Sequence, residues 1–252
     1  MFRTLLAKEL LEQRRTSKFL IFLAVFFIVG AMSPVLAKYT PQLLRAIPNV
    51  PPEMLSLIPT PTLADSVSQY AKNTSQFGVL LVVLMTMTVI SQERERGTAA
   101  MLFSKPVGRS ALVLSKWLAG LLTVTASVIV SGITCGIYTY VLFKGLPIGK
   151  YLIFNLLLLL FLAVYLSIAL LSSALARTQG MAAVIAFGGL TVLIVLGTLP
   201  RIDNYTPVGL LNWGSSLQLG AGTSHWPALL ISIALVVACL LASCLYLEKQ
   251  EI

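Results

Sequence analysis

Long apolar stretches and short polar segments alternate along this chain of 252 residues. Runs without Asp, Glu, Lys or Arg recur six times, and each is long enough to cross a bilayer core of roughly 30 Å, which takes about 20 helical residues. The last run, 204–247, is too long for one crossing, so only its second half is taken as spanning. The pattern predicts an all-α integral membrane protein with a single membrane domain over 1–252. Its six transmembrane helices are expected at 19–37, 73–92, 112–143, 151–176, 178–200 and 226–247.

The first 18 residues are amphipathic, with apolar side chains at helical spacing and charged side chains around them. Such a helix is expected to lie in the membrane interface against lipid before the chain turns into the first span. The alternative is that it extends that span into the cytoplasm. A cleaved signal peptide is disfavoured, because the 19 uncharged residues of 19–37 exceed the usual core of about 7–15. The residues that define the interfacial helix are Phe2, Leu5, Leu6, Lys8, Glu9, Arg14 and Arg15.

Three further segments have a local pattern of their own. Six prolines in 38–72 predict an irregular first part, followed by a short helix from Thr62 to Tyr70 with Asp65 completing a capping box. The stretch 208–220 is apolar but too short to span, which indicates a re-entrant or interfacial piece. Gly132 and Gly136 form a small-xxx-small pattern that lets helices approach closely.

The distribution of basic residues predicts the orientation of the chain in the membrane. Only 11% of the residues are charged, against about 25% in a soluble domain, and the net charge is +9. With the N-terminus inside, twelve basic residues fall on the cytoplasmic segments and six on the outer ones. We therefore expect a multi-pass cell-membrane protein with both termini cytoplasmic. Membrane orientation accounts for the basic balance, so no nucleic-acid partner is expected.

The sequence also lacks the residues that several kinds of chemistry require. Charged residues are missing from the middle of every span, which argues against a proton relay or an ion pump. His225 is the single histidine, so no catalytic zinc site is expected. The stretch Gly145–Tyr151 lacks the spacing and the Ser or Thr of a phosphate-binding loop. We expect no enzyme and no cofactor bound by this chain. A lipid-modifying enzyme would need a buried polar cluster, and the sequence indicates none.

The segment 91–109 is unusually structured for a loop between spans. Its first residues can continue the second span, with Glu93 and Arg96 as i,i+3 neighbours. Gly97 is placed to end that helix and Thr98 to cap another, which Pro106 would stop. The predicted object is a short, partly apolar helix on a helical stalk, which is typical of a docking site. A loop lying in the lipid headgroups is the alternative.

This segment resembles the signature of type 2 ABC transporter permeases. That family shows an acidic–basic pair, Gly-Thr, a short helix, Ser-(Lys/Arg)-Pro-Val-x-Arg and a lysine entering the third span. Near the N-terminus, Lys8-Glu9-Leu10 resembles the core of the family's interface helix. The matching residues of the signature are Glu93, Glu95, Gly97, Thr98, Ser104, Lys105, Pro106, Val107, Arg109 and Lys116.

The resemblance implies six transmembrane helices with an N-terminal interfacial helix, a cytoplasmic coupling helix between helices 2 and 3, and short re-entrant outer helices before helix 6. It implies a permease subunit, working as an exporter, with a second permease chain and two copies of a cytoplasmic ATPase that carries ATP and Mg. A non-transporting anchor or sensing subunit is the alternative. The implied ATPase-coupling residues are Glu93, Arg94, Glu95, Arg96, Gly97, Thr98, Met101, Leu102, Phe103, Ser104, Lys105, Pro106 and Arg109.

Overall fold

The computed structural model describes residues 2–45, 60–95, 108–199, 202–220 and 224–249. This part of the chain is helical, and it contains no strand. A single turn of 3-10 helix, η1, covers Asp203–Tyr205. The α-helices are α1 (Phe2–Arg15), α2 (Lys18–Arg45), α4 (Leu63–Thr86), α5 (Ser91–Glu95), α7 (Arg109–Phe143), α8 (Ile148–Leu175), α9 (Gln179–Thr198), α10 (Val208–Leu219) and α11 (Trp226–Lys249).

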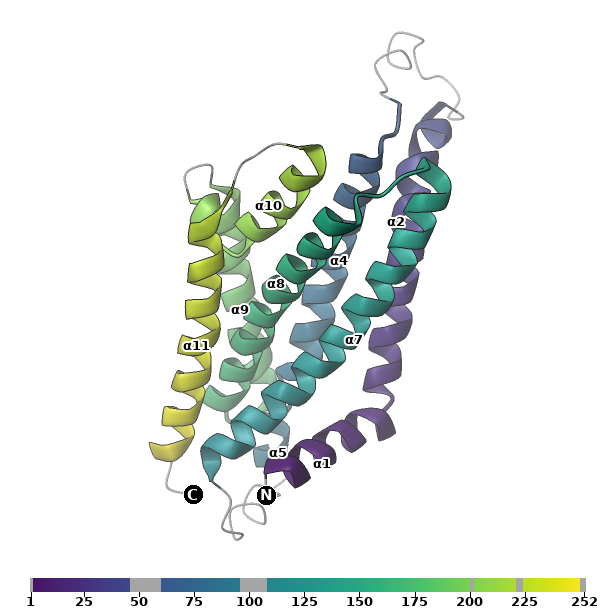
Figure 1. The fold of residues 1–252 in the computed structure, drawn as a ribbon. Helices are drawn as coiled ribbons and strands as arrows, with labels where there is room; N and C mark the ends of the chain where they lie inside the picture. The colour runs from purple at the N-terminus through teal and green to yellow at the C-terminus, as the bar shows by residue number, and fades with distance from the viewer. Residues whose placement is uncertain (1, 46–59, 96–107, 200–201, 221–223, 250–252) are drawn as a thin grey trace.

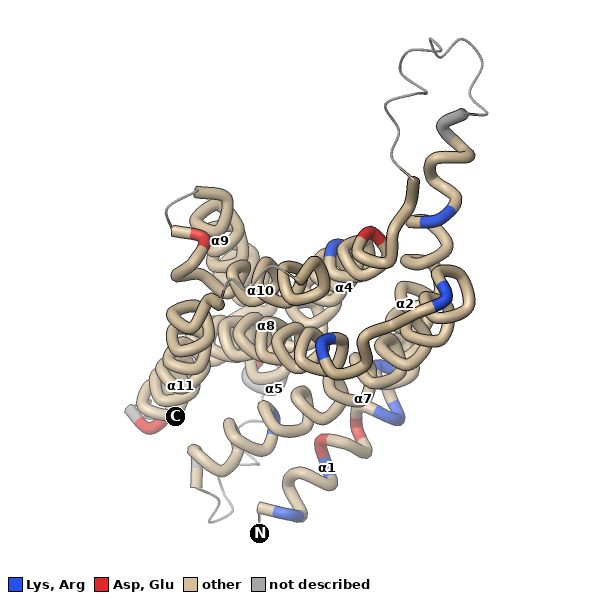
Figure 2. Tube along the Cα trace, turned by 45° about the horizontal axis from the view of Figure 1, so that its top comes forward, with Lys and Arg blue, Asp and Glu red and all other residues tan. Residues whose placement is uncertain are grey.

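Six long helices stand side by side as a bundle (Figure 1). The start of α1 and the last turn of α11 lie at the same end of the bundle, which we call the terminal end, and α10 lies near the opposite end. Charged residues gather toward the ends of the helices, and long uncharged stretches lie between them (Figure 2). This distribution is the one expected of helices that cross a bilayer.

Five helices of the described chain are long and apolar enough to cross a membrane, and the protein is therefore a multi-pass membrane protein. Their spanning parts match five of the expected helices within a few residues, except that α2 extends several residues further. The helix α4 is not among the five, because Asp65, Lys72 and several uncharged polar residues lower its hydropathy. The five parts are Lys18–Leu43, Ser110–Phe143, Ile148–Leu175, Gln179–Thr198 and Trp226–Glu248.

A turn at Thr16 and Ser17 separates α1 from α2. The amide of Thr16 donates to the carbonyl of Glu12 (2.9 Å), and Ser17 has a left-handed backbone with φ of 57°. The chain changes direction there, and α1 crosses beneath α7 at the terminal end (Figure 1). The alternative in which this segment continues the first span is therefore wrong.

The expectation of an irregular chain after residue 37 is wrong for its first part. The helix α2 continues through Pro34 and Pro41 to Arg45. Each proline removes one backbone donor, but in an apolar environment every other amide of the segment still gains by staying helical. The hydroxyl before each proline also bonds one turn back, since Ser33 donates to Val29 O (2.6 Å) and Thr40 to Leu36 O.

The predicted capping box at Thr62 is confirmed, but the helix that it starts is not short. The carboxylate of Asp65 accepts from the Thr62 amide (2.8 Å), and the Thr62 hydroxyl accepts from the Asp65 amide. The helix α4 then runs without a break to Thr86. Beyond it, residues 87–90 form a turn before α5, so the prediction that the second span continues as one unbroken helix into the following charged residues is wrong.

The helix α8 forms the centre of the bundle. In its most apolar 18-residue stretch 61% of the residues are buried, whereas the corresponding figure for α9 is 11%. The helices α2 and α7 approach each other closely, since a Cβ on Gly30 would lie 2.5 Å from the carbonyl oxygen of Ser131. On the other side of α8, Gly214 lets α10 pack against Phe154, and α10 ends at Gly220 with φ of 76°. The short apolar stretch before the last span is thus a helix packed on the core.

Candidate functional site

At the terminal end, polar side chains join elements that are distant in sequence. One group of contacts links α1 to α7, and a second links α5 to α8 and to the start of α9. We call both groups together the terminal junction. Its residues are Glu9, Gln13, Ser91, Glu95, Lys116, Thr123, Ser173 and Gln179.

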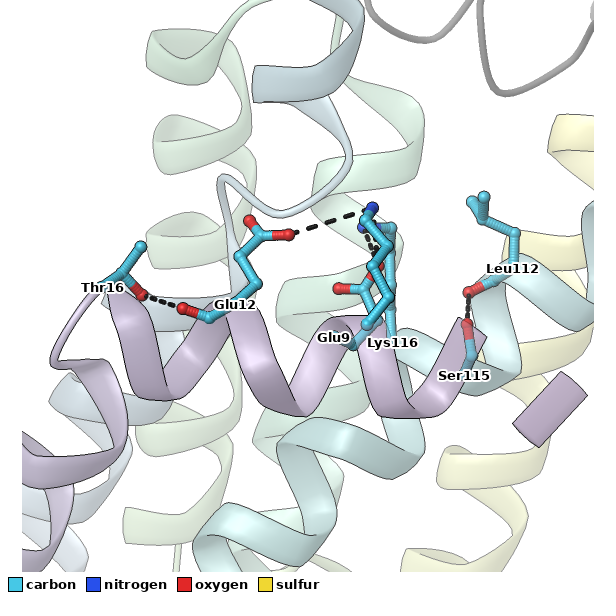
Figure 3. Close-up of polar contacts among 7 residues, drawn as sticks. Glu9, Glu12, Thr16, Leu112, Ser115 and Lys116 are labelled. Atoms are coloured by element: carbon cyan, nitrogen blue, oxygen red, sulfur yellow. Dashed lines mark hydrogen bonds and ion pairs between the residues drawn. The ribbon is translucent and has the colours of Figure 1, made fainter. Parts of the chain in front are cut away.

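The strongest contact of the junction is a buried ion pair between α1 and α7. The Lys116 Nζ lies 3.0 Å from the Glu9 Oε1, and the two side chains are only 1% and 8% exposed. Figure 3 shows the two side chains meeting between the helices. The half-exposed Lys8 contacts the same carboxylate oxygen at 3.3 Å. The carboxylate therefore lies between two ammonium groups, and this compensates for its removal from water.

A second contact fixes the direction of α1 on α7. The Thr123 hydroxyl donates to the side-chain oxygen of Gln13. Glu9 and Gln13 are four residues apart on α1, whereas Lys116 and Thr123 are seven residues apart on α7, so each pair lies on one face of its helix. The face of α1 that meets α7 is therefore polar at its centre. By contrast, the apolar Leu11 is exposed.

The turn between α4 and α5 is held by one side chain of α8. The Ser173 hydroxyl accepts from the amides of Ile90 (2.9 Å) and Ser91 (3.1 Å). Amides at the start of a helix have no partner within that helix, and their burial without one would be costly. Ser91 is itself fully buried here. The hydroxyl of α8 thus satisfies two amides where the helix is interrupted before α5.

The last residue of α5 reaches the start of α9. The Glu95 carboxylate accepts from the Gln179 amide at 3.4 Å, next to the N-cap Thr178, whose hydroxyl accepts from the Met181 amide. A negative charge is favourable at a helix N-terminus, where amides point outward. This contact is exposed, so it is weaker than the ion pair.

The predicted coupling residues are divided by what the structure describes. Glu95 lies in the junction. Glu93 and Arg94 belong to α5 and Arg109 begins α7. Gln13, Thr123, Ser173 and Gln179 were not predicted as site residues. The sequence did contain a signal for Gln13. It lies one turn after Glu9, on a face of α1 that is otherwise apolar. The predicted residues Arg96, Gly97, Thr98, Met101, Leu102, Phe103, Ser104, Lys105 and Pro106 lie outside the described residues.

Toward the opposite end, an uncharged polar cluster joins α4, α7 and α8. The Tyr70 hydroxyl donates to Asn155 Oδ1 (3.1 Å), Asn155 donates to the Tyr151 carbonyl (2.9 Å), and the Tyr151 hydroxyl donates to the Gly132 carbonyl (2.8 Å). The hydroxyls of Ser66 and Thr139 bond nearby (2.8 Å). We call these residues the hydroxyl–amide network. The cluster contains no charged residue, so the absence of charges from the predicted spans gave no sign of it.

The two glycines of the small-xxx-small pattern lie where α7 meets α8 and the loop before it. A Cβ on Gly132 would lie 2.8 Å from Asn155 Oδ1, and one on Gly136 would lie 3.4 Å from the Tyr151 ring. These glycines therefore leave room for the network. Among the described residues, no three His, Cys, Asp or Glu side chains are grouped so as to hold a metal ion.

Two open cavities are bounded by described residues of the helices. The larger, of about 470 Å³, is bounded by α4, α8, α9 and α10, with Phe161, Tyr165 and Phe187 among its walls. The smaller, of about 390 Å³, lies between α2 and α4. Both are lined mainly by apolar side chains, and their few polar groups belong to Ser75, Gln76 and Tyr165 in the larger cavity and to Asn73 in the smaller one.

One known protein family matches nearly the whole chain. The model of a family described as "ABC-2 family transporter protein" matches residues 3–252. The chain is also similar to the "Uncharacterized transmembrane protein YxlG" of Bacillus subtilis (strain 168), at 28% identity over 114 residues. That match covers 45% of this chain and 44% of the relative, so it spans less than half the length of either protein.

Proposed function

Because the chain belongs to the ABC-2 family of transporter proteins, we propose that it is the membrane permease subunit of an ATP-driven exporter. A separate cytoplasmic ATPase, in two copies, binds ATP and Mg, while this chain binds no cofactor and pairs with a second permease chain. The family match supports the permease role. The terminal junction supports the coupling role, because it joins both flanks of segment 96–107 to other helices.

The proposed topology has six spans, with α4 as the second. At 24 residues, α4 is about 36 Å long, which is enough to cross the hydrocarbon core. Its Ser66, Tyr70 and Thr74 are buried inside the bundle, so they are not exposed to lipid. The excess of basic residues on one side supports an orientation with the terminal end in the cytoplasm. In this topology α10 and η1 form the outer re-entrant part.

In the proposed mechanism, the ATPase binds the segment from Glu93 to Arg109 as a coupling helix. Closure of the two ATPase subunits on ATP moves this segment, and the motion passes into α5 before it and α7 after it. Tilting of the first three spans then opens a path for cargo between the two permease chains. ATP binding by the partner favours the closed state, since a conformational change needs a ligand that prefers one state, and ATP hydrolysis supplies the free energy of the complete cycle.

The cargo in this proposal is apolar or amphiphilic. The helices carry few charges, and the larger cavity has mainly aromatic and aliphatic walls, with polar groups on Ser75, Gln76 and Tyr165 and no charged side chain among its lining residues. Its volume of about 470 Å³ is within the usual range for small-molecule sites, about 300–1,000 Å³. Such a cavity suits a hydrocarbon chain better than a hydrated ion.

The decisive experiment is reconstitution of the full chain with the ATPase that co-purifies from its native membranes. We expect ATP hydrolysis to depend on the permease, and export of a fluorescent single-chain amphiphile from liposomes to depend on ATP. Glu93→Gln and Arg96→Gln should each uncouple hydrolysis from export without reducing membrane insertion. Failure to recover an ATPase would contradict the permease role. An ATPase complex that moves no amphiphile would support the anchor or sensing role instead.

A further inference from the structure

The helix α1 is attached to the bundle in two different ways. At its C-terminal end, the turn at Thr16 and Ser17 connects it to α2. Along its length, it packs mainly against α7, with the ion pair Glu9–Lys116 and the hydrogen bond Gln13–Thr123 as polar contacts. Two contacts at different heights fix both the position and the direction of a helix, whereas one would leave it free to pivot.

From these contacts we propose that Glu9 is a positioning residue that fixes α1 to α7, so that the two helices move as one rigid unit during transport. This inference rests on the proposed permease function for its meaning, but the attachment itself is a property of the chain alone. An interfacial helix held only by lipid would be free to slide, and Glu9 would then face water or headgroups. Instead its side chain is only 8% exposed and meets a lysine that is 1% exposed.

The burial of both charges explains why the attachment persists through a cycle. Separation of Glu9 from Lys116 would leave each charge in surroundings of low polarity without its main counter-charge, which is strongly unfavourable. A motion that keeps the pair together is therefore favoured over one that breaks it. Because Arg109 is only seven residues before Lys116, a displacement of segment 96–107 reaches this pair within two turns of α7.

The attachment also gives the Thr16–Ser17 turn a role. If α1 follows α7, then the change of angle between α1 and α2 is taken up at this turn. Ser17 already has a left-handed backbone, and the Thr16 hydroxyl bonds to the carbonyl of Glu12 (2.8 Å), which closes α1. The hinge is thus outside both helices.

The attachment can be measured in the purified full chain in lipid nanodiscs. Spin labels at Leu11→Cys on α1 and Leu122→Cys on α7 sit on exposed side chains, with Cys135, Cys239 and Cys244 replaced by alanine. We expect a narrow distance distribution that Glu9→Gln broadens. The matched control is Glu12→Gln, one turn away on α1 at an exposed position, which should leave the distribution narrow. Equal distributions for the two variants would overturn the proposal.

In the complex with its ATPase, the same label pair should keep its distance when ATP is added, and Glu9→Gln should reduce permease-dependent hydrolysis at least roughly tenfold. A change of the wild-type distance with ATP would overturn the rigid unit. The reversed pair Glu9→Lys with Lys116→Glu should recover the narrow distribution. If single variants misfold, recovery of folded protein by the reversed pair supports the attachment, and equal misfolding of the reversed pair contradicts it.

The experiments can contradict the permease function and the attachment of α1 to α7 independently of each other. If no ATPase binds the chain, the permease function fails, while the nanodisc distances still decide the attachment. If Glu9→Gln broadens the distance distribution while ATP hydrolysis stays coupled, then Glu9 does attach α1 to α7 in the wild type. The attachment would not be used for coupling in that case, and the positioning role is rejected.

Discussion

The terminal junction and the hydroxyl–amide network join helices in different ways. The junction combines two carboxylates and a lysine with hydroxyl and amide side chains, and it holds short or interrupted pieces: α1, α5 and the first turn of α9. The network uses hydroxyls and one amide, and it joins α4, α7 and α8 where each is continuous. Charged and uncharged contacts together hold separate pieces at one end, whereas uncharged bonds alone link long helices toward the other.

This difference indicates which part of the molecule moves. At the terminal end, the turns at 16–17 and 87–90 allow the angle between the helices that they connect to change. Continuous helices that are linked by several hydrogen bonds are instead expected to shift together. The predictions below should separate the two regions: variants of the junction should change coupling, and variants of the network should change stability alone.

The largest effect is expected for Lys116→Met, which leaves the buried Glu9 carboxylate without its main counter-charge. Breaking a buried pair by removing one partner costs about 3–5 kcal/mol, and the contact of Glu9 with Lys8 should keep the loss at the lower end. Thermal unfolding in detergent measures it. The exposed Lys72→Met is the control, and equal unfolding temperatures of the two variants would contradict the importance of the pair.

A smaller effect is expected for Gly30→Val, which pushes α2 away from α7. The new Cβ would lie 2.5 Å from a backbone oxygen of Ser131, and overpacking of this kind typically costs about 1–3 kcal/mol. Gly188→Val on α9 is the matched control, because nothing lies within 4 Å of a Cβ there. Unfolding of both variants in parallel shows the difference, and a control as unstable as Gly30→Val would argue against a close approach of α2 and α7.

The network itself is probed by Asn155→Leu, which removes the acceptor of Tyr70 and the donor to Tyr151 O. Hydrogen bonds between membrane helices contribute about 0.6–2 kcal/mol each, so we expect a loss of that order and an intact coupled ATPase. Tyr70→Phe removes one of these bonds and should cost less. A loss of coupling without loss of stability in Asn155→Leu would reverse the assignment of the two regions.

The smallest effect is expected for Glu95→Gln. An exposed carboxylate at a helix N-terminus stabilises by about 0.3–1 kcal/mol, so the unfolding temperature should hardly change. Hydrogen exchange at the first amides of α9 should nevertheless become faster, since the carboxylate bonds to the Gln179 amide. Unchanged exchange there would show that α5 and α9 are not joined through this contact.

The sequence allowed most of the fold to be predicted, because a charge-free run of about 20 residues is a strong constraint on a helix in a bilayer. The helices α8, α9 and α11 lie within a few residues of their predicted bounds. The length of α4 was missed because Asp65 and Lys72 interrupt its apolar pattern. The spacing of Ser66, Tyr70 and Thr74, four residues apart, could have shown a buried polar face on one long helix.

The junction was much less predictable. Glu9 and Lys116 are 107 residues apart, and a single sequence gives no means to pair two positions at that distance. What could be predicted was local: a helix over 1–18 and a charged segment before the third span. The capping box at Thr62 succeeded for the same reason, since both partners lie within one turn.

The Glu9–Lys116 pair also has a consequence for how the protein is made. Synthesis from the N-terminus delivers the carboxylate long before its partner lysine, so α1 must wait at the membrane surface while the first two spans insert. Lys8, the adjacent residue, contacts the same oxygen at 3.3 Å and is available from the start. Lys8 can compensate the charge of Glu9 during that interval, and the carboxylate contacts both Lys8 and Lys116 once α7 has inserted. Glu9 therefore has a cationic neighbour on its own helix before α7 is made, and two once α7 is in place.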